Sequence, residues 1–241
     1  AKELLQSGVR ASEVAPLVTK AGIRGDYLAA SRSNPGLRPR TYGAPAGRSL
    51  EGFLFPATYE LRRSDATART LVGEQVQAFK DNTANVSWRY ARSKNLSRYD
   101  VLIIASMIER ETAVARERRL IAGVIYNRLK RDIPLGIDAT TRYAEDNWTQ
   151  PLTNAELNRD SPYNTRRNQG LPPTPIGNPG LASIRAAANP RRTGYLFYVV
   201  KPCANGAHAF SKTDAQFQKD VAAYNAKREA LGGRDPSTCP K

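Results

Sequence analysis

The sequence contains a single histidine, His208, with only two cysteines and one methionine among its 241 residues. A Ser/His/Asp arrangement would therefore depend wholly on His208. The chain also lacks the HExxH and GxSxG patterns, the phosphate-binding GxxxxGK[ST] loop and the dinucleotide glycine pattern. These absences argue against the commonest zinc, serine-hydrolase and nucleotide-dependent classes of enzyme, and they leave carboxyl groups as the main candidates for proton transfer.

Long hydrophobic runs are missing too. The longest, residues 101–108, has eight residues and includes Ser106, whereas a helix needs about 20 apolar residues to cross a bilayer. The chain as written therefore spans no membrane. It begins at Ala1 without a methionine, a basic segment or an apolar leader, so we expect a mature form or a piece of a longer protein.

Acidic residues are scarce relative to basic ones. Asp and Glu number 22 against 37 Lys and Arg, which gives a formal net charge of +15. Such a surface attracts polyanions, whether nucleic acid, anionic lipid or an anionic cell-wall polymer. Nucleic-acid binders usually concentrate their basic residues, whereas here these occur as scattered singles and pairs, so nucleic acid is not an expected partner.

The two cysteines, Cys203 and Cys239, lie 36 residues apart near the C-terminus, with no CxxC motif or histidine cluster around them. We therefore expect neither a metal site nor a cofactor. A disulfide that ties down the C-terminal tail is the favoured interpretation, and it would indicate an oxidising, extracytoplasmic location. The alternative is that both are unpaired small core residues.

Hydrophobic periodicity predicts an α+β fold, with a helix-rich domain, a small antiparallel sheet and long loops. Residues 50–61 are predicted to be extended, and residues 194–201 and 206–212 are predicted to form a hairpin. Ser12 and Ser97 are predicted N-caps. Helices are predicted at residues 2–5, 12–21, 66–80, 98–131 with a break near 113–117, 154–158, 181–188 and 213–231.

Two segments are rich in proline and glycine. Residues 34–48 have the composition of a loop or linker, so we place a domain boundary there. Residues 134–190 form a second loop-rich segment, and a segment of this length inside a domain is uncommon unless it builds a binding site.

Glu109 and Glu111 follow directly after the apolar run, on a predicted helix. A helical wheel places Glu109 between Leu102 and Ala105, and apolar neighbours would favour the protonated carboxyl that a general acid needs. The wheel does not separate the two glutamates, because Glu111 also falls between apolar residues. The alternative is that one or both pair with Arg110, Arg116 or Arg118 in a structural network.

Several motifs, in order along the chain, resemble the endolytic murein transglycosylases of the MltG (YceG-like) family. The resemblance covers residues 50–224, and its joint pattern is more specific than any single motif. The motifs are EGFLFPATYEL at 51–61, ASMIERET at 105–112, YNRL at 126–129, LxxDxTxxY at 135–143, SPYNT at 161–165, GLPPTPIGNPG at 170–180, YLFYV at 195–199 and GAHAFS at 206–211.

This resemblance implies that Glu109, the first glutamate of the ExET motif, is the catalytic residue. Lytic transglycosylases cleave the β-1,4 bond between N-acetylmuramic acid (MurNAc) and N-acetylglucosamine (GlcNAc) without water. They leave a 1,6-anhydro end, so one carboxyl can serve first as acid and then as base, whereas ordinary glycosidases use two. Glu111 is expected to support Glu109. The expected substrate-binding residues are Asp138, Thr140, Tyr163, Asn164, Thr165 and His208.

The sequence departs from the family pattern at Gly136, where a polar residue is usual, and at Arg166, where an aromatic residue is common. The family normally carries an N-terminal membrane anchor and a LysM-like subdomain. We therefore expect residues 1–48 to be the remainder of a LysM-like or linker region and residues 49–241 to be the catalytic domain, with an anchor upstream of Ala1.

The resemblance also implies peptidoglycan strands as substrate, peptidoglycan synthases as possible partners, and a location on the extracytoplasmic face of the bacterial cell membrane. A rival hypothesis is a non-catalytic basic module that uses the same cleft and charge to hold peptidoglycan or teichoic acid.

Overall fold

The computed structural model describes residues 2–239. It is helix-rich and carries two separate two-stranded antiparallel sheets, β1–β2 and β3–β4. The predicted α+β class, with many helices and little sheet, is confirmed. The elements in chain order are β1 (Lys2–Leu4), α1 (Ala11–Lys20), α2 (Tyr27–Ala30), η1 (Pro39–Tyr42), β2 (Thr58–Glu60), η2 (Arg63–Asp65), α3 (Ala68–Thr83), α4 (Arg89–Arg92), α5 (Arg98–Glu111), η3 (Ala115–Glu117), α6 (Arg118–Leu129), α7 (Asp138–Glu145), α8 (Asn154–Asn158), α9 (Leu181–Ala188), β3 (Phe197–Val200), β4 (His208–Ser211) and α10 (Asp214–Ala230).

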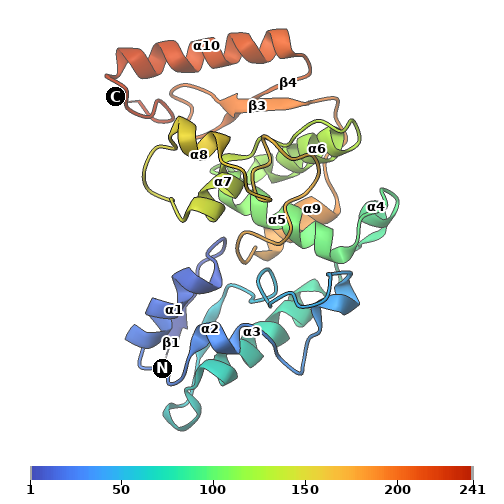
Figure 1. The fold of residues 1–241 in the computed structure, drawn as a ribbon, viewed down its shortest axis with the longest axis vertical. Helices are drawn as coiled ribbons and strands as arrows, with labels where there is room; N and C mark the ends of the chain where they lie inside the picture. Colours follow the sequence, from blue (N-terminus) through green and yellow to red (C-terminus); the bar gives the residue numbers. More distant parts are fainter. Residues whose placement is uncertain (1, 240–241) are drawn as a thin grey trace.

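Figure 1 shows three groups of elements along the long axis of the molecule. The first sheet with α1, α2 and α3 lies at one end, α5, α6, α7 and α9 occupy the middle, and the β3–β4 hairpin with α10 lies at the other end. One hydrophobic core runs through the first two groups, from Leu5 to Ala188. Helix α5 is its central element, and all its side chains at positions 101–108 are buried.

The predicted break in the long central helix is confirmed. Ser97 caps α5 through a reciprocal pair of bonds with Asp100, as its N-cap position predicts. The helix ends at Glu111, and α6 begins at Arg118 after a short 3₁₀ turn. Because α9 packs against both α5 and α6, the end of α5 is held between two other helices.

The N-terminus differs from the prediction. Residues 2–4 form strand β1 instead of a helix, and β1 pairs antiparallel with β2 in the register Glu3↔Tyr59. So short a segment gains little as an isolated helix, whereas pairing satisfies its backbone groups. Helix α1 starts from Arg10 as N-cap, two residues before the predicted Ser12. Because β1 pairs with β2, the first group of elements combines residues from both sides of position 48.

The C-terminal elements agree with the prediction. β3 and β4 form the expected hairpin, and α10 follows with Thr213 as its N-cap. Cys203 in the hairpin loop is bonded to Cys239, so the disulfide links the hairpin to the C-terminal tail. Within residues 2–239, no helix combines the length and apolar character needed to cross a membrane.

Candidate active site

Glu109 lies in the last turn of α5 with its side chain only 8% exposed. One carboxylate oxygen, Oε1, accepts a hydrogen bond from Ser7 Oγ at 3.1 Å and lies 3.7 Å from Nη2 of Arg118. The other, Oε2, accepts from the backbone N–H of Gly180 at 2.9 Å. Polar donors therefore hold the carboxyl tip, in place of the apolar neighbours expected from the helical wheel.

These donors come from three distant segments. Ser7 belongs to the loop between β1 and α1, Gly180 is the N-cap of α9, and Arg118 opens α6. Arg118 also donates from Nε to Ser183 Oγ at 3.2 Å, which ties its guanidinium to α9. A carboxylate placed at the N-terminus of α9 gains from the helix dipole as well as from the single N–H bond.

Two loops meet closely beside Glu109. The N–H of Gly8 donates to the Asn178 carbonyl at 2.8 Å, and the N–H of Asn178 donates to the Val9 carbonyl at 3.0 Å. A Cβ on Gly177 would lie 2.1 Å from the Gly8 carbonyl oxygen, and a Cβ on Gly8 would lie 3.3 Å from Glu109 Cγ. The approach of the two backbones thus requires glycine at position 177.

A buried hydrogen-bond network anchors these loops. The Asn178 side chain accepts through Oδ1 from the N–H groups of Gly52 and Leu54 at 2.8 and 3.1 Å. Its Nδ2 donates to Glu51 at 2.7 Å and to the Val9 carbonyl at 3.1 Å. The Glu51 carboxyl also accepts from the N–H of Ala11 at the start of α1. Asn178 therefore joins the loop that carries Gly180, the loop that carries Ser7, and the segment after position 50.

Burial of Glu51 raises its pKa to about 7, and the nearby Glu13 adds to this effect. The hydrogen bonds from Ala11 and Asn178 and the charge of Arg10 act in the opposite direction without cancelling it. Glu51 therefore changes its charge near neutral pH, next to the loops that hold Glu109.

Glu111 faces different partners from Glu109. Its Oε2 accepts from the Tyr198 hydroxyl at 3.2 Å, and its carboxyl also bonds the backbone of Ala139 in α7. Burial raises the pKa of Glu111 to about 7, and the negative charge of Asp138 raises it further. Burial likewise raises the pKa of Tyr198 well above its usual value. Glu111 thus joins the end of α5 to α7 and β3.

The structure brings several of the predicted binding residues together around α7, a helix that the sequence analysis did not predict. Asp138, its first residue, is half exposed and forms an ion pair with Arg166, one of the two departures from the family pattern. Thr140 is fully buried, and its hydroxyl lies 3.0 Å from that of Thr165. Thr165 Oγ1 also accepts from the N–H of Ile137 at 3.0 Å, so the two threonines fasten the 161–168 loop to α7.

Asn164 is also buried, and its Nδ2 donates to the carbonyls of Leu157 and Arg159 at 3.0 and 2.8 Å. Tyr163 is half-buried, with its hydroxyl 2.8 Å from Thr174 Oγ1 and its ring against Tyr143. Asp138 and Tyr163 therefore have exposed surface available to a ligand, while Thr140, Asn164 and Thr165 make their hydrogen bonds inside the protein.

His208 lies apart from these groups, in β4. Its Nδ1 is 2.8 Å from Oε2 of Glu117, and its backbone N–H donates to the same carboxyl. The side chains of this pair are only 6% and 7% exposed. His208 thus joins the hairpin to the 3₁₀ turn before α6.

Sequence reasoning missed Ser7, Gly180 and the Glu51–Asn178 network, and it named Arg118 only as a structural partner. Glu51, Asn178 and Gly180 all fall inside motifs that carry the family resemblance, so their signal was present without a role attached. In residues 2–239, no group of three or more His, Cys, Asp or Glu side chains is arranged to hold a metal ion.

The geometry brings together one shielded glutamate with a hydroxyl, a backbone N–H and a guanidinium, all directed at its carboxyl. A sequence model of the YceG-like family matches residues 3–223. The chain belongs to this family.

Curated relatives and a solved structure agree with this assignment. An endolytic murein transglycosylase of Bacillus subtilis (strain 168) is 37% identical over 176 residues, which are 73% of this chain and 48% of the relative. One of Streptococcus pneumoniae (strain R6) is 40% identical over 180 residues, 73% of this chain and 32% of the relative. The chain thus spans half or less of the length of these relatives. The 2.6 Å crystal structure of a YceG-like protein from Listeria monocytogenes is similar with a TM-score of 0.78 and 31% identity, covering 91% of this chain and 75% of that one.

Proposed function

We propose that this chain is the catalytic part of an endolytic murein transglycosylase, a carbon–oxygen lyase acting on polysaccharide. It cleaves the β-1,4 MurNAc–GlcNAc bond of nascent peptidoglycan without water and leaves 1,6-anhydro-MurNAc ends, which limits the length of glycan strands. The observation that carries this proposal is the position of Glu109, shielded and held by Ser7, Arg118 and Gly180 in a chain whose relatives bear that enzyme's name.

In the proposed mechanism, protonated Glu109 donates its proton to the glycosidic oxygen as the bond to C1 of MurNAc breaks. The resulting carboxylate is stabilised by the Gly180 N–H and by the charge of Arg118. It then removes the proton of the MurNAc C6 hydroxyl, whose oxygen closes on C1. The first proton leaves on the GlcNAc hydroxyl and the C6 proton replaces it on Glu109, so no water is consumed and a single carboxyl completes the cycle. The Ser7 hydroxyl can donate to the carboxylate or accept from the acid, which suits both protonation states.

Substrate binding is proposed for a cleft that includes Asp138 and Tyr163, both with exposed polar or aromatic surface. Thr140, Asn164 and Thr165 would serve binding through the shape of the 161–168 loop, since their own hydrogen bonds are internal. Glu111 would support the site by fixing the end of α5 to α7. His208 would act indirectly, through the position of the hairpin.

We further propose that the enzyme works on the extracytoplasmic face of the membrane, attached by an N-terminal anchor and acting beside peptidoglycan synthases. The Cys203–Cys239 disulfide supports an oxidising compartment. Within the chain, residues 1–48 are the proposed remainder of a LysM-like or linker region. Strand β2, which pairs with β1, lies beyond this boundary and ends at Glu60.

The test is digestion of uncrosslinked glycan strands, followed by mass spectrometry. The proposal expects ends lighter by one water than the products of hydrolysis. Glu109→Gln should bind strands and lose cutting by about 10²–10⁴-fold, the usual contribution of general acid–base catalysis. The matched control is Glu74→Gln on the exposed face of α3, which should cut like the wild type. Binding without cutting by the wild type would instead support the non-catalytic wall-binding module, and heavier, hydrolysed ends would contradict the lytic mechanism.

A further inference from the structure

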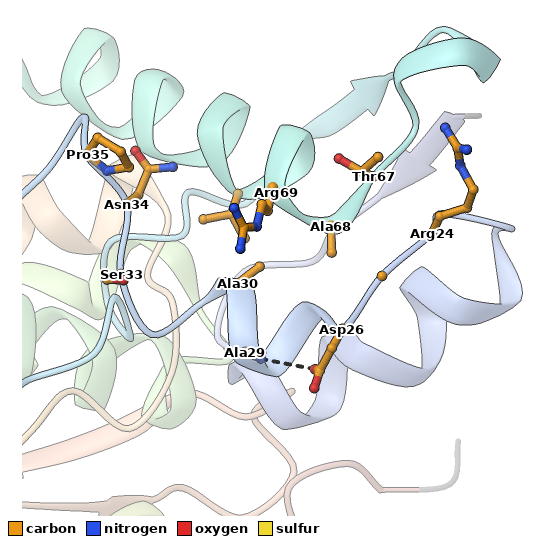
Figure 2. A pocket seen from close by; sticks show the side chains of 12 residues that line it. Arg24, Asp26, Ala29, Ala30, Ser33, Asn34, Pro35, Thr67, Ala68 and Arg69 are labelled. Atoms are coloured by element: carbon orange, nitrogen blue, oxygen red, sulfur yellow. Dashed lines mark hydrogen bonds between the residues drawn. The ribbon is translucent and has the colours of Figure 1, made fainter.

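Two hollows adjoin at the end of the molecule that contains the first sheet. One, of about 780 Å³, lies between α2, the 33–35 segment and the start of α3, as Figure 2 shows. The other, of about 720 Å³, is formed by residues 32–48. Ser33, Asn34 and Pro35 line both hollows, so together they form a continuous concave track, which we call the arginine track.

Arginine dominates the charge of the arginine track. The first hollow contains Asp26 as its one carboxylate, and the second contains none. Asp26 accepts from the N–H of Ala29 and caps α2, so one of its carboxylate oxygens is already engaged. In the described part of the chain, no arginine of the track has a carboxylate within 4 Å. The six arginines are Arg24, Arg32, Arg38, Arg40, Arg48 and Arg69.

The backbone that carries these arginines is anchored to the core. Leu37 and Ala44 are buried between the arginines of the second hollow along the chain, and Leu50 is buried two residues after the last of them. Arg98 donates to the Thr41 carbonyl at 2.6 Å and lies over the ring of Tyr42, which fixes the middle of the segment. The Nε of Arg48 is buried without a hydrogen-bond partner.

The lining residues indicate what kind of anion fits. Guanidinium groups bind phosphate oxygens in a bidentate way. The residues that line the two hollows include no Phe, Tyr or Trp, and aromatic faces are what single-stranded nucleic acid needs for base stacking. A concave track also suits a flexible chain better than a flat membrane. We propose that the arginine track binds an anionic, phosphate-bearing linear polymer through its phosphate groups.

The test measures binding of short-chain inorganic polyphosphate to the full chain by calorimetry at several salt concentrations. The wild type should bind, with affinity falling steeply as salt rises. Arg38→Gln combined with Arg40→Gln should weaken binding about tenfold or more for each lost contact, and should reduce the salt slope by about 0.7 for each. The matched control combines Lys201→Gln in the hairpin with Lys219→Gln in α10. It changes the net charge by the same amount as the double arginine variant and should leave binding nearly unchanged.

Three results would overturn the proposal. The first is no polyphosphate binding by the wild type, and the second is equal weakening by both double variants, which would show general charge attraction. The third is a loss of binding to phosphatidylglycerol vesicles in the arginine variant while its polyphosphate binding persists, which would assign the track to a membrane surface. Because the track is separate from Glu109, the arginine variant should cut glycan strands normally. If the proposed cutting activity proved absent, the binding test could still be interpreted, because it does not depend on cleavage.

Discussion

Replacing Asn178 with alanine tests whether one buried side chain holds the loops around Glu109 together. The substitution removes the acceptor for the N–H groups of Gly52 and Leu54 and one donor to Glu51. A buried donor left without a partner costs about 1–3 kcal/mol. We therefore expect the free energy of unfolding to fall by about 4 kcal/mol, a large share of the roughly 5–15 kcal/mol typical of a domain. Denaturant unfolding measures this loss.

The same variant should also slow glycan cutting, because Asn178 belongs to the loop that brings the Gly180 N–H to Glu109. Asn178→Asp separates the loss of the acceptor from the loss of the donor. It keeps the acceptor for Gly52 and Leu54 but places a second carboxyl beside Glu51. Its loss of unfolding free energy should therefore be smaller than that of Asn178→Ala below about pH 6 and should approach it above pH 7. Asn82→Ala, on the exposed face of α3, is the control and should cost less than about 0.5 kcal/mol. An Asn178→Ala loss below about 1 kcal/mol would refute the reasoning.

Three further predictions concern pH, packing and redox state. The pKa values of Glu51 and Glu111 rise from 4.5 to about 7 on folding, so the folded state binds more protons and stability should fall as pH rises through this window, by at most about 3 kcal/mol for each group. Glu51→Gln should make the dependence of unfolding free energy on pH shallower, and an unchanged slope would contradict the burial argument. Gly177→Ala should destabilise the protein by more than about 2 kcal/mol and reduce cutting, because its Cβ would clash with the Gly8 carbonyl oxygen. The control is Gly22→Ala, which has φ +73° but open space around it and should cost only about 1 kcal/mol. Reduction of Cys203–Cys239 should lower the unfolding free energy by about 3 kcal/mol without slowing cutting, measured by unfolding and strand digestion in parallel; unchanged stability on reduction would show that the tail is held by other contacts.

Local signals account for the parts of the fold that were predicted. Helices α5 and α6 are encoded by an apolar run, a capping serine and a polar break, all within one stretch of chain. The β3–β4 hairpin is likewise encoded by adjacent segments with strong strand propensity. Strand β1 could not be predicted this way, since its partner β2 lies more than fifty positions away.

The candidate site likewise has one part that local signals predict and other parts that depend on distant segments. Glu109 could be selected as a candidate because it follows an apolar run and lies in a motif. Its partners could not, because Ser7 is separated from it by 102 positions and Gly180 by 71. The composition of residues 34–48 and the family resemblance set residues 1–48 apart from the rest of the chain, and this is where Ser7 lies. The internal hydrogen bonds of Thr140, Asn164 and Thr165 could not be predicted either, since a motif does not reveal which way a side chain points.

The distance along the chain between Ser7, Glu109 and Gly180 has a consequence for the order in which the protein is made. During synthesis Ser7 emerges first, yet its partner Glu109 follows about a hundred residues later and the Gly180 N–H later still. Contacts of such separation form late in folding, after the local helices. The complete environment of Glu109 therefore cannot exist until residue 180 has been made, so the carboxyl stays without its full set of partners while the earlier segments fold.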